Sequence, residues 1–167
     1  METSTLRDLC LSAGAAAHLA ACASAQVPRT PKPEECPPGA IVAMTQTLGN
    51  LFIRESNPYH WPGPGIQLTE GGGRWVPVRE GDTSIILADR WGTLPANTVL
   101  TGKMYFAQGR VFARLTRAWT PQGTTFPICA EVWEENERGL EMKPGSTRDN
   151  VQAFSTASYV RAVRHFD

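Results

Sequence analysis

Alternating apolar and polar residues dominate the second half of the chain and predict β-strands. The apolar positions are Leu100, Met104 and Phe106 in Thr98–Phe106, Val111, Ala113 and Leu115 in Arg110–Trp119, and Phe126, Ile128, Ala130 and Val132 in Phe126–Trp133. Because successive side chains of a strand point to opposite faces, we expect these residues in the core, and Arg114 and Thr116 on the opposite face. Short connections at Gln108-Gly109 and Gln122-Gly123 favour an antiparallel meander.

Further segments extend this pattern at both ends. Trp75–Arg79 and Ser84–Ala88 flank Gly81-Asp82 and are typical of a hairpin, and Val151–Ser155 and Tyr159–Val163 would add two strands. Upstream, Gly39–Gly49 places Ile41, Met44 and Leu48 on one helical face and ends in a glycine, which predicts a short helix. The predicted fold is therefore mostly β: a small antiparallel barrel or sandwich over residues 39–167, with one short N-terminal helix.

The N-terminus has the pattern of an export signal over residues 1–25. A short apolar stretch, Leu9–Ala21, precedes the small residues Ala23-Ser24-Ala25 and is too short to span a bilayer. Residues 19–22, Leu-Ala-Ala-Cys, resemble a bacterial lipobox, so we expect lipidation at Cys22 and a lipid anchor. Cleavage after Ala25, giving a secreted or periplasmic protein, is the alternative, and an alanine-rich helix on a cytoplasmic protein is another.

A proline-rich stretch follows at residues 26–38. Its five prolines favour the polyproline II conformation over helix or sheet, so we expect a tether between anchor and domain.

Composition and charge narrow the function classes. The chain has 167 residues, with 16 Lys and Arg against 16 Asp and Glu, giving a net charge of zero. A nucleic-acid-binding protein normally carries a basic excess, so nucleic acid is not an expected partner.

Candidate catalytic groups are few. The three histidines, His18, His60 and His165, have no second His or Cys at ligand spacing, and no glycine-rich phosphate loop occurs, so we expect neither metal nor cofactor. The glutamates 131, 134, 135 and 137 could hold an acid/base pair of the glycosidase kind, but a solvated hairpin tip is the simpler interpretation.

Aromatic residues give the main binding hypothesis. Tyr59, His60 and Trp61 lie in a loop rich in Pro and Gly, where ligand-contacting residues concentrate. The alternative is that such rings cap the small β core.

Cysteine parity predicts a disulfide. Cys10 leaves with the signal, and Cys22 is either acylated or removed, so Cys36 and Cys129 remain as a pair in an oxidising compartment. Two buried thiols or a reactive Cys129 are the alternatives.

Several short motifs resemble an uncharacterised family of myxobacterial exported proteins and lipoproteins. They are Cys36–Ala40 with Met44, Leu100–Gly102, Gly109–Val111, Thr125–Glu131, Phe154–Thr156 and Val160–Val163. The family is similar to domains at the C-termini of some membrane-bound serine/threonine kinases of those bacteria. The resemblance implies an extracytoplasmic domain and no particular activity, and this chain carries no kinase residues.

These observations predict a binding or interaction module of the cell envelope without a catalytic centre. Its expected partners are the membrane, through the lipid anchor, and an envelope protein or glycan. An enzyme acting on envelope polysaccharide is the alternative.

Overall fold

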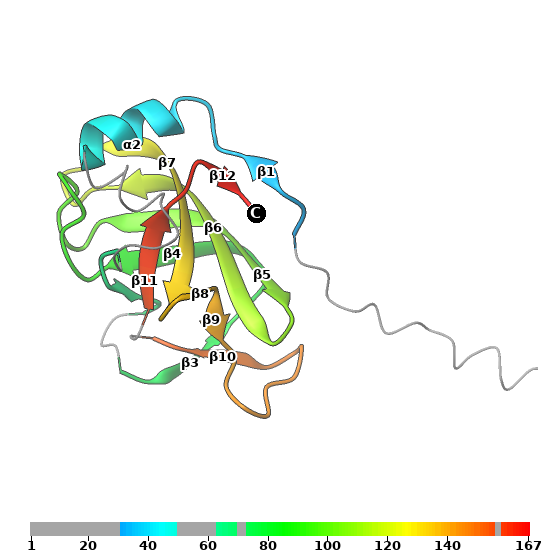
Figure 1. Cartoon of the computed structure of the whole chain (residues 1–167). Coiled ribbons are helices and arrows are strands. Elements are labelled where there is room, and N and C mark those ends of the chain that lie inside the picture. The colour runs from blue at the N-terminus through cyan, green and yellow to red at the C-terminus, as the bar shows by residue number, and fades with distance from the viewer. Residues whose placement is uncertain (1–30, 50–62, 70–72, 156–157) are drawn as a thin grey trace, which may run out of the picture.

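The computed structural model describes residues 31–49, 63–69, 73–155 and 158–167 (Figure 1). Its helix is α2 (Ala40–Leu48). The strands are β1 (Glu34–Glu35), β2 (Ile66–Gln67), β3 (Trp75–Val78), β4 (Gly81–Leu87), β5 (Val99–Ala107), β6 (Arg110–Trp119), β7 (Thr125–Glu134), β8 (Glu137–Arg138), β9 (Leu140–Glu141), β10 (Val151–Phe154), β11 (Ser158–Ala162) and β12 (His165–Phe166). The mostly β fold with one short helix is confirmed for the described residues.

The main sheet is antiparallel and curls into a half-barrel. Its strand order is β11-β7-β6-β5-β4-β2, with β8 and β9 attached to β7 and β6. The two edges approach each other, because Gly65 forms an isolated bridge to Tyr159 and the Val160 N–H donates to the Pro64 carbonyl oxygen at 3.1 Å. The curl gives the sheet a concave inner face and a convex outer face.

The inner face holds the hydrophobic core. Leu100, Val111, Leu115, Ala130 and Val132 are each at most 1% exposed, as their alternation predicts. Phe126, expected with them, is only half-buried.

Helix α2 covers one end of this core (Figure 1). Ala40, Met44 and Leu48 recur every fourth residue and are buried, whereas Ile41 is half-buried. The Cys129 N–H donates to the Met44 sulfur at 3.0 Å, which joins the helix to β7. Gly92 permits the close approach of the helix end, since a Cβ there would lie 2.4 Å from the Thr47 oxygen.

The predicted hairpin of Trp75–Arg79 with Ser84–Ala88 is wrong. β3 pairs with β10, Val78 opposite Val151, and β4 pairs with β5, so the chain changes sheet between β3 and β4. Glu80 marks this change, because its carboxylate accepts the Phe106 N–H at 3.0 Å and holds the start of β4 against β5. Ile85 and Leu87 are then buried in the main core rather than against β3.

The expectation that the proline-rich stretch forms no ladder is wrong at β1. Glu34 and Glu35 pair with Phe166 and His165 of β12. Both glutamates retain the backbone N–H that proline lacks, so these two residues between Pro33 and Cys36 can join a ladder.

Candidate functional site

The disulfide Cys36–Cys129 joins the segment after β1 to the middle of β7, as cysteine parity predicts. The Cα atoms are 5.4 Å apart, within the range that a disulfide requires. Protein disulfides persist in oxidising compartments. The bond therefore indicates an extracytoplasmic environment.

Arg114 fastens both ends of the described chain to the outer face of the sheet. We call Arg114, β1 and β12 the clasp. Arg114 is 6% exposed, although strand alternation predicted it on the face opposite the core. Its guanidinium donates to the backbone oxygens of Lys32 (2.6 Å), Asp167 (2.8 Å) and Pro31 (3.3 Å) and to the Glu34 carboxylate (3.2 Å), and it lies over the rings of Tyr105 and Phe166. The outer face is thus buried wherever the clasp covers it.

Glu131 is a second buried ionisable side chain beside the clasp. It lies opposite Arg114 on β6 and Arg161 on β11, and it is 5% exposed. Burial raises the pKa of Glu131 from 4.5 to about 7, and the nearby Arg138 opposes this, with 3.6 Å between its Nη1 and Glu131 Oε1. The interpretation of the acidic run as a solvated tip is therefore wrong for Glu131. It holds for Glu135 and Glu137, which are exposed.

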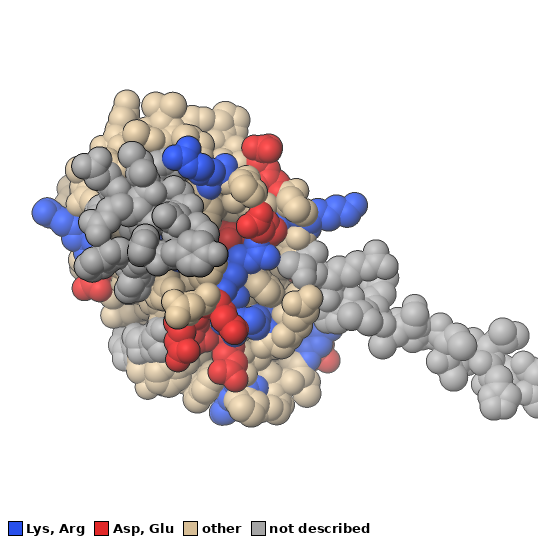
Figure 2. All heavy atoms as spheres, viewed as in Figure 1, with Lys and Arg blue, Asp and Glu red and all other residues tan. Residues whose placement is uncertain are grey.

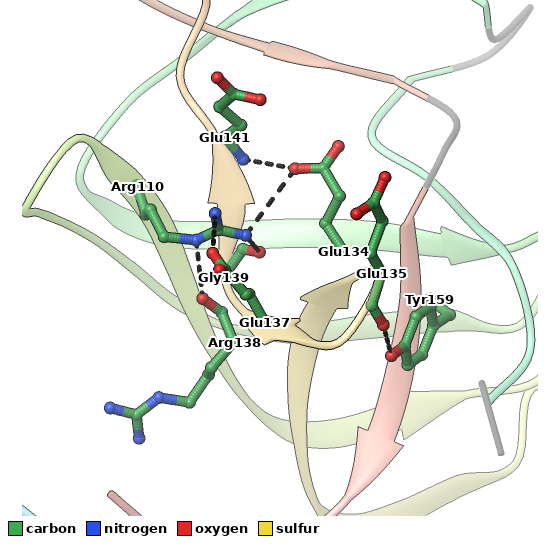
Figure 3. Close-up of polar contacts among 8 residues, drawn as sticks. All are labelled: Arg110, Glu134, Glu135, Glu137, Arg138, Gly139, Glu141 and Tyr159. Carbon is green, nitrogen blue, oxygen red and sulfur yellow. Dashed lines mark hydrogen bonds and ion pairs between the residues drawn. The ribbon is translucent and has the colours of Figure 1, made fainter. Parts of the chain in front are cut away.

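Arg110 locks the hairpin that carries the rest of the acidic run (Figure 3). Its Nη1 donates to the Glu137 carboxylate at 2.7 Å, while Nε and Nη2 donate to the backbone oxygens of Arg138 (2.9 Å) and Gly139 (2.7 Å). Glu134 accepts the Glu141 N–H at 2.6 Å. The Glu137 carboxylate thus accepts a hydrogen bond from Arg110, and the Glu134 carboxylate accepts one from the backbone. This arrangement is suited to stabilising the hairpin rather than to acid/base chemistry.

Tyr159 ties the same hairpin to β11, since its hydroxyl donates to the Glu135 carbonyl oxygen (Figure 3). Figure 2 shows the result on one face, a band in which acidic and basic side chains lie next to one another. Arg161 lies over the Trp133 ring at 4.3 Å and Arg138 over the Phe112 ring at 5.4 Å. The charges of this band are largely engaged within the protein.

A different part of the outer face is hollowed. A groove of about 450 Å³ crosses β4, β5 and β6, and we call it the outer groove. It is lined by Asp82, Thr83, Ser84, Thr101, Gly102, Lys103, Thr116 and Arg117. A smaller hollow of about 140 Å³ lies between the β5–β6 turn and the loop before β10.

A β-bulge shapes the outer groove. The register of β5 with β6 shifts at Thr101/Gly102, and a Cβ on Gly102 would lie 1.9 Å from the Arg114 oxygen. The backbones of β5 and β6 therefore come close together at Gly102, where no side chain projects. This close approach forms the shallow floor of the outer groove. Lys103 is opposite Arg114 in register, so the groove borders the clasp. Sequence reasoning missed this site, because the alternation that places Ser84, Thr101 and Lys103 outward does not reveal a bulge.

The predicted site residues divide into two groups. Cys36 and Cys129 are brought together, whereas Cys22, Tyr59, His60 and Trp61 lie outside the described residues. His165 pairs with the Asp167 carboxylate at 2.9 Å. Within the described ranges, no group of three or more His, Cys, Asp or Glu residues could hold a metal ion, and no helix is long and apolar enough to cross a membrane.

Comparison of the chain with protein-family models, curated proteins and solved structures finds no significant match. The class of protein therefore rests on its own structure: a disulfide-bonded extracytoplasmic β domain with an open polar groove.

Proposed function

We propose that this protein is a binding module of the bacterial cell envelope, anchored by a lipid on Cys22. The observation that carries the proposal is the outer groove, a polar hollow of about 450 Å³ on a sheet to which the disulfide and the clasp fasten the neighbouring chain segments. Binding residues on a rigid scaffold lose little conformational entropy when a ligand arrives. The resemblance to myxobacterial exported proteins supports the same location.

The hollow also favours binding over hydrolysis. Acid/base cleavage of a glycan needs two carboxyl groups converging on one bond. Asp82 is the one carboxylate that lines the groove among the described residues. Glu131, whose pKa of about 7 would suit a general acid, is buried beside the clasp and does not line the groove.

The anchor is tested by metabolic labelling of the full chain with palmitate. We expect label in the wild type and in Cys10→Ala, the matched control, but none in Cys22→Ala. Equal labelling of wild type and Cys22→Ala would overturn lipidation. An unlabelled wild type whose N-terminus begins at Gln26 would replace the anchor by simple secretion.

The binding function is tested by co-sedimentation of the full chain with envelope fractions, namely peptidoglycan sacculi, outer-membrane vesicles and surface polysaccharide. We expect saturable binding to one fraction and no shortening of its polymers. The absence of saturable binding to every fraction would overturn the proposal. Progressive shortening of a polymer would instead support the polysaccharide-acting enzyme.

A further inference from the structure

The outer groove carries two cationic side chains that have no ion pair or hydrogen bond with the described residues, Lys103 and Arg117. Other arginines of the same face are engaged: Arg110 with Glu137, Arg114 with Glu34, and Arg138 with Glu131. Asp82 lies opposite Lys103 in register, yet the two side chains form no ion pair within the described structure. The groove therefore presents positive charge that the described residues do not pair.

Hydroxyl groups surround these charges. Ser84 on β4, Thr101 on β5 and Thr116 on β6 line the same hollow, and Asp82 adds an acceptor. A hydroxyl both donates and accepts, and a carboxylate accepts, so together they match the hydroxyl groups of a sugar. Lys and Arg match a carboxylate, since charge-assisted hydrogen bonds are stronger than neutral ones.

An exposed tryptophan lies on the same strand as Arg117, just beyond the residues that line the groove. Trp119 follows Arg117 by two residues on β6, so strand alternation places both side chains on the outer face. Its exposure is 45%, which is high for a large apolar side chain. An indole ring provides a flat, rigid surface for the apolar face of a sugar ring. The strand thus places a stacking surface next to a cation.

We propose that the outer groove binds an acidic polysaccharide, with Lys103 and Arg117 on its carboxylates, the Ser and Thr hydroxyls on its sugar hydroxyls, and Trp119 against a sugar ring. This inference rests on the proposed function, because it names the ligand class of the same groove. Lys103 and Arg117, which are unpaired among the described residues, favour an acidic over a neutral polymer. The hydroxyls and the ring favour a sugar over an acidic peptide.

The test measures equilibrium binding of the full chain to three polymers: polygalacturonate, neutral dextran and polyglutamate. We expect binding to polygalacturonate that weakens with added salt and is at least about tenfold tighter than binding to either other polymer. Equal binding to dextran would overturn the role of the cations. Equal binding to polyglutamate would show attraction to charge alone and overturn the sugar assignment.

Variants locate the site. Lys103→Ala/Arg117→Ala should weaken polygalacturonate binding by at least about tenfold. Trp119→Ala should weaken it severalfold. Arg79→Ala/Arg90→Ala is the matched control, because it removes the same charge from exposed residues outside the groove and should change the affinity less than about twofold. Equal losses in the two double variants would overturn the groove as the site.

The same variants separate this inference from the proposed function. If Lys103→Ala/Arg117→Ala still sediments with the envelope fraction as the wild type does, the groove assignment fails and the binding module stands. If the wild type sediments with no envelope fraction, the proposed function itself fails.

Discussion

Replacing Arg114 by alanine should destabilise the protein about as much as removing a large core side chain. The two shortest hydrogen bonds join its guanidinium to the backbone oxygens of Lys32 (2.6 Å) and Asp167 (2.8 Å). Hydrogen bonds to charged groups contribute about 1.5–3 kcal/mol each. The ion pair with Glu34 adds little, since that side chain is 64% exposed. Breaking such a buried set costs about 3–5 kcal/mol, a large fraction of the stability of a typical domain.

Urea unfolding at pH 7 with the disulfide intact measures this cost. Arg117→Ala is the control on the same strand, because Arg117 is exposed, and it should change the free energy of unfolding by less than about 0.5 kcal/mol. Arg114→Lys should fall between the two, because lysine keeps the charge but loses the planar fork that reaches several oxygens. A cost below about 1 kcal/mol for Arg114→Ala would refute the clasp as a stabilising element.

Three further predictions concern stability. Leu115→Ala should cost about 2–5 kcal/mol in the same urea assay, because Leu115 is fully buried; a cost no greater than that of Arg117→Ala would contradict the strand register. Cys36→Ala/Cys129→Ala should lower the free energy of unfolding by about 4–5 kcal/mol, since the half-cystines are 93 residues apart and the bond restricts a long loop of the unfolded chain; unchanged stability would contradict this. The pKa of Glu131 is about 7 in the folded protein, against an ordinary value of 4.5. As the pH rises, the unfolded chain therefore loses this proton before the folded protein does. The free energy of unfolding should fall by about 3 kcal/mol as the pH rises from the lower value to the higher. Urea unfolding across this range should show the fall in the wild type and not in Glu131→Gln, and an identical fall in both would exclude Glu131 as its cause.

Local pattern predicted the parts of the fold in which neighbouring strands follow one another along the chain. Leu100, Val111 and Leu115 alternate with polar residues, and β5, β6 and β7 pair in sequence order through short connections. The partner of β3 could not be found this way, because β10 lies far along the chain and no local signal distinguishes it from β4. Parity of the cysteines predicted a long-range contact, since only two remained to pair.

The buried charges show a second limit. Alternation correctly placed Arg114 on the face opposite the core, but it cannot say whether that face meets water. In this protein the β1–β12 ladder crosses the outer face. That ladder depends on the pairing of Glu34 with Phe166, which lies at the far end of the described chain. Outward residues are thus buried under the clasp and exposed in the outer groove, although both belong to the same strands.

This division separates the residues that stabilise the sheet from those of the proposed binding site. Arg110 and Arg114 donate to several protein oxygens each, so using either on a ligand would cost the fold those bonds. Lys103 and Arg117 make no such bonds with the described residues, and their side chains can engage a ligand without weakening the sheet. The bulge at Gly102 lies at the boundary, since it moves the strand backbones together where the clasp ends and the groove begins. Changes in the groove should therefore alter binding while the free energy of unfolding stays nearly constant, and changes in the clasp should do the reverse.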